Sequence, residues 1–145
     1  MIISSAAFLN SGEIPVAYTC NGENINPPLI WGDIPEGTKS LALIVDDPDA
    51  PGGTWTHWVV WNIDPEDGEI VESRTPPGAS EGITSFGEHG YDGPCPPDSS
   101  HRYFFTLYAL DTDLGLPDTT TARELQVAMK NHVITDTYLM GTYEQ

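Results

Sequence analysis

The sequence has 145 residues, with 5 Lys and Arg against 22 Asp and Glu, which gives a formal net charge of −17 at pH 7. So few cations argue against binding to nucleic acid or to an anionic membrane surface, because both interactions depend on positive charge. No apolar run approaches the roughly 20 residues of a membrane span. The length is typical of one domain, residues 1–145, and the N-terminus lacks a signal-peptide pattern, so we expect a cytoplasmic protein.

The 14 glycines and 13 prolines favour many short strands joined by turns. Short apolar or β-branched runs predict where the strands lie, although the first and the last run are weakly marked. In chain order the expected strands are Ile14–Tyr18, Ser40–Asp46, Thr54–Ile63, Arg102–Leu110 and Tyr138–Tyr143. Residues Asp64–Pro94 show no long element and are expected to form an extended loop with at most one short strand.

One helix is predicted late in the chain. Thr121-Ala122-Arg123-Glu124 is a capping box, in which the Thr hydroxyl accepts from a backbone N–H and the Glu carboxylate reaches back. Leu125, Ala128, Met129 and His132 then recur at helical spacing and predict one buried face through about His132. We interpret Met129 and His132 as core and rim residues. Strands still dominate, so the sequence predicts a mainly β protein: an antiparallel Greek-key β-sandwich with one or two short helices.

Side-chain alternation along the strong strands places polar groups at strand ends. The residues expected to share a face are Leu41, Leu43, Val45 and Asp47 on the first strand, Trp55, His57, Val59, Trp61 and Ile63 on the second, and His101, Tyr103, Phe105 and Leu107 on the third. The first two strands can pair antiparallel across Pro48–Gly53. If the third strand runs parallel to the second, the Asp, the two His and the Tyr meet at one sheet edge. The sequence therefore predicts a pocket with an apolar floor and these polar groups at its mouth.

Each polar residue also has a purely structural interpretation. A His on an apolar strand face is often a hydrogen-bonded core residue, Asp47 before Pro48 can be a turn residue, and Tyr103 can be core with its hydroxyl at the rim. Their joint placement at strand ends favours a site. The segments Pro48–Pro51 and Gly93–Pro97 flank them, and their prolines predict a rigid, preformed pocket.

Cys20 and Cys95 are the only cysteines, and they show neither zinc-ligand spacing nor a C-x-x-C motif. Three states stay open: two separate buried thiols, a single disulfide, and a reactive thiol. A disulfide would be surprising in a reducing cytosol.

Two motifs carry a family resemblance. Asp47-Pro48-Asp49-Ala50-Pro51 followed by His57, and Gly93-Pro94-Cys95-Pro96-Pro97 followed by His101-Arg102-Tyr103, resemble the two signature regions of the phosphatidylethanolamine-binding proteins, also called Raf-kinase-inhibitor-like proteins. The segments Tyr18–Gly22, Asn26–Leu29 and Ser85–Gly87 are similar to the bacterial and archaeal branch, so the resemblance covers almost the whole chain. It implies a central antiparallel β-sandwich with a small pocket for phosphate-like groups.

Carried over by position, the resemblance implies a set of ligand-binding residues: Asp47, Pro51, His57, Gly93, Pro97, His101 and Tyr103. The chain departs from the eukaryotic members in two places. The segment between Pro51 and His57 is short and has no Tyr, so Trp55 is expected to fill that wall, and no long helix follows Tyr143.

The expected function is a non-enzymatic binding or regulatory protein that recognises phosphate, phosphoethanolamine or a phosphorylated partner, without a cofactor or metal. His57, His101 and Tyr103 are expected to donate to the anion, while Asp47 either accepts from one His or binds the ammonium of a zwitterionic ligand. Binding should strengthen from about pH 8 to 6, because the His side chains become charged. Arg102 points away by alternation and is expected to pair with Asp49 or another acid.

Two alternatives stay open. One is a protease or kinase inhibitor that acts through a protein surface and so has a protease or a protein kinase as its partner. The other is a metal or acid–base enzyme that uses Asp47, His57 and His101, although no H-x-H or H-x-x-x-H spacing supports it. The expected oligomeric state is a monomer or a homodimer.

Overall fold

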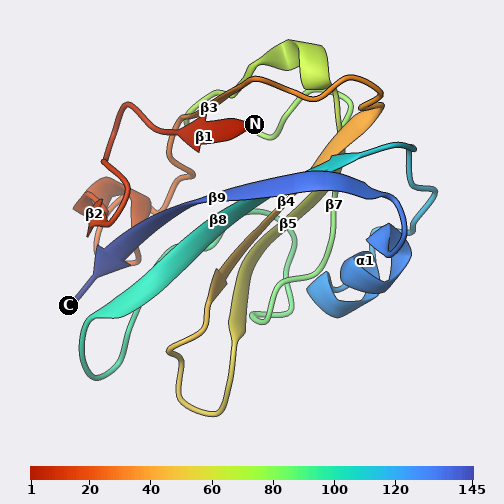
Figure 1. The fold of residues 1–145 in the computed structure, drawn as a ribbon. Helices are drawn as coiled ribbons and strands as arrows, with labels where there is room; N and C mark the ends of the chain where they lie inside the picture. Colours follow the sequence, from red (N-terminus) through yellow and green to blue (C-terminus); the bar gives the residue numbers. More distant parts are fainter.

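The computed structural model describes residues 1–145 and consists of two β-sheets and one α-helix (Figure 1). The smaller sheet contains β1 (Ile2–Ser4), β3 (Leu29–Gly32) and β6 (Glu69–Ile70). The larger sheet has the order β2 (Gly12–Glu13), β9 (Val133–Tyr143), β8 (His101–Leu110), β4 (Ser40–Asp47), β5 (Trp55–Ile63) and β7 (Ser80–Glu81). Within it, β8-β4-β5-β7 has the spatial order of a Greek key. The predicted mainly β fold is confirmed.

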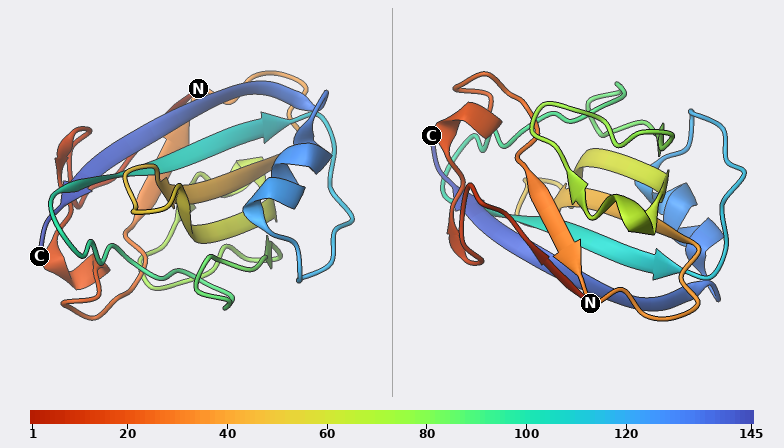
Figure 2. Two further views of the ribbon diagram at one scale, coloured as in Figure 1. Left: turned by 90° about the horizontal axis from the view of Figure 1, so that it is seen from below. Right: turned by 90° about the horizontal axis from the view of Figure 1, so that it is seen from above.

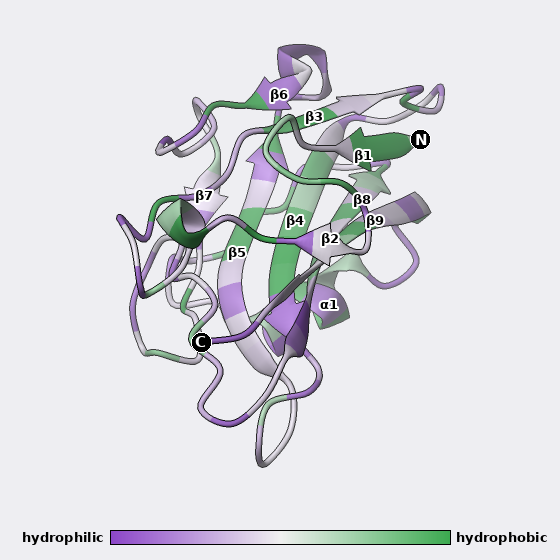
Figure 3. Cartoon of the chain, turned by 90° about the vertical axis from the view of Figure 1, so that its left-hand side faces the viewer, coloured by the Kyte–Doolittle hydropathy of each residue, from purple (hydrophilic) through white to green (hydrophobic).

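The two faces of the larger sheet are covered by different layers. The three-stranded sheet lies over one face and the helix α1 (Ala122–Met129) over the other, as the two views in Figure 2 show. The main core fills the space between the sheets and includes Leu43 of β4 and Phe105 of β8. A smaller cluster, with Ile44 and Leu125, packs beneath α1. Hydropathy follows this arrangement, since green, apolar colouring runs along the central strand β4 and along β1, whereas many of the loops are purple (Figure 3).

The capping box predicted at Thr121 is confirmed. The Thr121 hydroxyl accepts from the Glu124 N–H at 3.3 Å, and the Glu124 carboxylate accepts from the Thr121 N–H at 3.1 Å. Met129 is buried, as its core interpretation requires. The helix ends at Met129, earlier than the periodicity suggested, and His132 is exposed and hydrogen-bonded to Asp111.

Three element assignments need correction. The segment Ile14–Tyr18 is no strand, because Pro15 precedes a 3-10 helix over Val16–Tyr18. The segment Asp64–Pro94 contains two short strands, β6 and β7, and a second 3-10 helix, Pro65–Asp67. The last strand begins at Val133 rather than Tyr138. None of the residues 133–137 is buried, so this half of the strand shows no apolar alternation that could predict it.

The expected face assignment of β5 is wrong because the β4–β5 pairing contains two register shifts. Val45 pairs with Trp58 whereas Asp46 pairs with Thr56, so His57 is an extra residue on β5, as in a β-bulge. Consequently Trp58, Val60 and Ile63 belong to the main core, whereas Val59 and Trp61 pack toward α1. β4 pairs antiparallel with β5, as predicted, and also with β8, so that β8 runs parallel to β5 as the predicted pocket requires.

Cys20 and Cys95 form a disulfide with a Cα–Cα distance of 5.4 Å. Of the three states considered, the structure has the one that a reducing cytosol disfavours. The bridge joins the segment after the first 3-10 helix to the proline-rich loop before β8. No helix of the protein combines the length and the apolar character needed to cross a bilayer.

Candidate functional site

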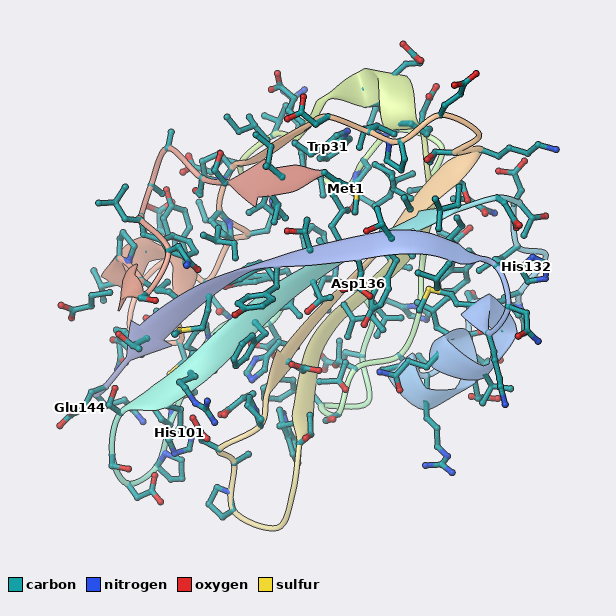
Figure 4. All side chains as sticks on the ribbon, in the orientation of Figure 1. Met1, Trp31, His101, His132, Asp136 and Glu144 are labelled. Carbon is teal, nitrogen blue, oxygen red and sulfur yellow. A yellow bond between two sulfur atoms is a disulfide. The ribbon has the colours of Figure 1, made fainter.

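A cavity of about 270 Å³ opens at the edge of the larger sheet where β4 ends and β5 and β8 begin. Figure 4 labels His101 at this edge, and the loops 48–54 and 98–100 project from the same end of the molecule in Figure 1. The cavity is lined by Asp47, Ala50, Pro51, Trp55, His57, Phe86, Cys95, Pro96, Pro97, His101 and Tyr103. The strand ends that the sequence argument brought together therefore do converge.

His101 is held between two carboxylates. Its Nδ1 donates to Asp47 Oδ2 at 2.7 Å and its Nε2 donates to Asp98 Oδ1 at 2.7 Å. Burial alone lowers the pKa of His101, but the hydrogen bonds to the two carboxylates outweigh it, and the net shift raises the pKa above its usual value. The ring is therefore an imidazolium with both N–H groups already engaged.

Asp47 is both a turn residue and a His partner. Its Oδ1 accepts the Asp49 N–H at 2.8 Å, as its turn interpretation predicts, while its Oδ2 accepts from His101. The side chain is almost fully buried. Both oxygens are thus occupied within the protein, which agrees with the expectation that Asp47 orients a His.

His57 is in a different state from His101. Its Nδ1 lies 2.6 Å from the Asp92 carbonyl oxygen, which can only accept, so Nδ1 carries a hydrogen. Burial lowers the pKa of His57, and the hydrogen bond to Asp92 compensates only in part. The neutral ring therefore has an unprotonated Nε2, which can accept a hydrogen bond, or donate one if the ring becomes charged.

Tyr103 occupies the floor between the two imidazoles. Its ring centroid lies 5.3 Å from that of His57 and 6.5 Å from that of His101. The side chain is 1% exposed, and its hydroxyl makes no hydrogen bond of ordinary geometry. Burial, followed by the nearby Asp47 carboxylate, raises the pKa of the phenol, so the hydroxyl stays protonated. Its O–H is therefore buried without an acceptor at hydrogen-bonding geometry, with the Asp47 carboxylate close by.

The cavity walls are largely apolar and confirm part of the sequence reasoning. Trp55 lines the wall, as expected because the segment before His57 has no Tyr. Its ring meets the Phe86 ring edge to face, with the two centroids 5.4 Å apart. Arg102 points away and binds Asp49 through two nitrogens, at 2.8 and 2.9 Å, as predicted. That pair holds the pKa of Asp49 down to about 2.

All but one of the predicted pocket residues line the cavity. The exception is Gly93, which is buried behind the wall, where a Cβ would come within 2.1 Å of the Tyr18 carbonyl oxygen. Phe86 as a lining residue and Asp98 as a partner of His101 were not predicted from the sequence, because both belong to irregular loops that strand periodicity does not describe. No group of three or more His, Cys, Asp or Glu side chains is arranged to hold a metal ion.

Two packed sheets with a small cavity at one edge of the larger sheet define a β-sandwich protein. The model of the phosphatidylethanolamine-binding protein family matches residues 4–144. The chain belongs to that family.

Its relatives are found in archaea and bacteria. A UPF0098 protein of Methanothermobacter thermautotrophicus is 47% identical, with 100% of this chain and 99% of that protein aligned. The crystal structure of CT736 from Chlamydia trachomatis, described as a homolog of phosphatidylethanolamine-binding protein, has a TM-score of 0.95 at 43% identity and covers 99% of this chain and 96% of its own. Escherichia coli YbcL, described as a member of the mammalian family, has a TM-score of 0.93 at 30% identity, with 99% and 97% covered.

Proposed function

We propose that this chain is a non-enzymatic binding protein whose cavity takes a small ligand, or a phosphorylated group of a partner, through a phosphate-like oxyanion. One observation carries the proposal: the Tyr103 hydroxyl is a buried donor, without an acceptor, on the floor of a cavity. Buried polar groups are nearly always paired, so an unpaired one at a cavity indicates that a ligand supplies the acceptor.

The other polar groups complement an oxyanion in distinct ways. Tyr103 donates to one ligand oxygen, and the free Nε2 of His57 accepts the proton of a P–OH group or, once protonated, donates to a second oxygen. The His101 imidazolium contributes positive charge close by. Asp47 makes no ligand contact in this arrangement, because its oxygens already accept from His101 and from the Asp49 N–H.

The apolar walls suit the remainder of the ligand. Trp55, Phe86 and three prolines surround the polar floor. Such a collar excludes water from the anion and contacts a short alkyl chain, such as the ethylene group of phosphoethanolamine. Because prolines restrict the backbone, little ordering cost is expected on binding.

Calorimetric titration tests the proposal. At pH 7 the protein should bind inorganic phosphate and phosphoethanolamine but not ethanolamine, which lacks the phosphate. His57→Ala should abolish measurable binding, whereas His132→Ala, which changes a His–Asp pair outside the cavity, should not. Absence of phosphate binding at millimolar concentration would reject the proposal. An inhibitor acting through a protein surface would keep its partner in His57→Ala.

The disulfide bears on the expected cytoplasmic location. Such bridges persist mainly in oxidising compartments, and inside cells chiefly in hyperthermophiles. We propose that the Cys20–Cys95 bridge is intact where the protein works. Alkylation of thiols in freshly lysed cells should therefore leave both cysteines unmodified, whereas labelling of both would show that the working protein is reduced.

A further inference from the structure

Asp98 is an acidic residue beside the cavity that has no role in the proposed function. Its Oδ1 accepts from His101 Nε2 at 2.7 Å, the same length as the bond from Nδ1 to Asp47. The two carboxylates differ in burial, however. The Asp98 side chain is 58% exposed, whereas that of Asp47 is 4% exposed. One partner of His101 is therefore built into the core and the other lies in solvent.

The charges around His101 do not by themselves attract an anion. The imidazolium carries one positive charge, and Asp47 and Asp98 carry two negative charges between them. Arg102 adds no net positive charge, because it is paired with the Asp49 carboxylate. The cavity thus has a net negative floor while Asp98 is in place, although its donors are suited to an oxyanion.

The position of Asp98 explains this contradiction. His101 is 2% exposed and its Nδ1 is fixed on Asp47, so Nε2 is the only N–H that the ring can offer to a ligand. An Asp98 carboxylate oxygen occupies that N–H. A carboxylate oxygen has the charge and the hydrogen-bonding capacity of a phosphate oxygen.

We propose that Asp98 is a tethered competitor, which occupies the anion position on His101 in the free protein and is displaced when an oxyanion binds. This inference rests on the proposed function and adds a regulatory residue to the same site. Displacement is physically accessible, because Asp98 is exposed and its only other hydrogen bond is with the adjacent Ser99 N–H, at 2.8 Å.

The competitor also selects among ligands. Asp98 satisfies His101 alone and leaves both the Tyr103 hydroxyl and the His57 Nε2 unpartnered. A simple carboxylate such as acetate replaces Asp98 with little gain. A tetrahedral oxyanion has further oxygens for Tyr103 and His57, so phosphate gains contacts that Asp98 cannot make. The site should therefore discriminate against free carboxylates.

Titration of two variants tests the inference, with inorganic phosphate and acetate as the probes. Asp98→Ala should bind phosphate roughly two- to fivefold more tightly than the unaltered protein, which is the range expected for losing one exposed ionic competitor. Asp98→Asn, which keeps an oxygen acceptor but no charge, should lie between the two. Asp118→Ala is the control: it removes the charge of another exposed aspartate, one that does not line the cavity, and should change the affinity less than twofold. Acetate should bind measurably only to Asp98→Ala.

NMR gives a second measurement that does not depend on stability. In the unaltered protein, added phosphate should move the chemical shift of the Asp98 carboxyl carbon toward the value of an Asp side chain that makes no ion pair. If phosphate binds Asp98→Ala and Asp98→Asn no more tightly than the unaltered protein, Asp98 is a support for His101 and the inference is overturned while the proposed function stands. If phosphate binds none of the three, both are overturned.

Discussion

Replacing Tyr103 by Phe should have opposite effects on stability and on binding. The substitution removes one oxygen that is buried and has no hydrogen-bond partner, and it keeps the ring that packs between the two imidazoles. A buried polar group without a partner costs about 1–3 kcal/mol. We therefore expect Tyr103→Phe to stabilise the free protein by about 1 kcal/mol, which for a chain of this size raises Tm by roughly 2–4 °C.

The same oxygen is proposed to donate to the bound oxyanion. A hydrogen bond to a charged group contributes about 1.5–3 kcal/mol, so its loss should weaken phosphate binding roughly 10- to 100-fold. Thermal unfolding measured with and without phosphate reads both effects in one assay. Added phosphate should raise the Tm of the unaltered protein. The Tm of Tyr103→Phe should be higher without phosphate and should rise little when phosphate is added.

The control is Tyr138→Phe, since Tyr138 is 55% exposed on β9 and lies outside the cavity. It should leave both Tm and phosphate affinity unchanged. A lower Tm for Tyr103→Phe in the absence of ligand would mean that the hydroxyl is satisfied in the free protein. Phosphate affinity within twofold of the unaltered protein would mean that the hydroxyl does not face the anion.

Three further predictions follow from the burial and bonding of single groups. Replacing Cys20 and Cys95 together by Ser should lower the free energy of unfolding by about 2–4 kcal/mol in urea titrations, because the bridge closes a loop with a sequence separation of 75; no change would show that the thiols are reduced. Burial, and then the charge of Asp47, raises the pKa of Asp46 to about 6, so this acid destabilises the fold as pH rises from 3.8 to 6. Asp46→Asn should therefore raise Tm at pH 7 and have no effect at pH 3. Phosphate affinity should rise up to tenfold per pH unit as pH falls from 8 toward 6. The Nε2 of neutral His57 can only accept a hydrogen bond, so dianionic phosphate must take up a proton to form the complex. A flat pH profile measured by calorimetry would contradict this role of His57.

Much of the larger sheet could be predicted because one physical signal dominates it. The central strands β4, β5 and β8 are apolar on buried faces, and their runs are bounded by Pro, Gly and Asp. The capping box likewise depends on side chains three positions apart in the sequence. These elements are encoded by residues close together in the chain, so a sequence pattern is sufficient.

The face of the sheet to which His57 belongs could not be predicted in the same way, although its position at the strand end could. Strict alternation puts His57 on the face of Val59 and Trp61, which in the structure is the face covered by α1. The extra residue at the bulge reverses the alternation, so that His57 reaches the cavity with Trp55. Nothing in an apolar, β-branched run marks where a register shift falls, because the bulge is decided by pairing with β4.

The partners of the imidazoles were also beyond a periodicity argument. Asp98 and Asp92 lie in loops without regular structure, and their contacts with His101 and His57 depend on the path of the proline-rich segment. That path is fixed by distant residues. The Cys20–Cys95 bridge holds it, and so does the hydrogen bond from the Gly93 N–H to Asn24 Oδ1 at 2.8 Å.

The polar groups of the cavity divide into those that are satisfied inside the protein and those that the proposed function leaves for a ligand. Asp47, with both oxygens bonded inside the protein, belongs to the first group. Tyr103, the free nitrogen of His57 and the solvent-facing bond of His101 belong to the second. Because the first group is satisfied without a ligand, the cavity keeps its shape when empty. Because the second group is not fully satisfied within the core, binding energy can be gained there without breaking any buried contact of the fold.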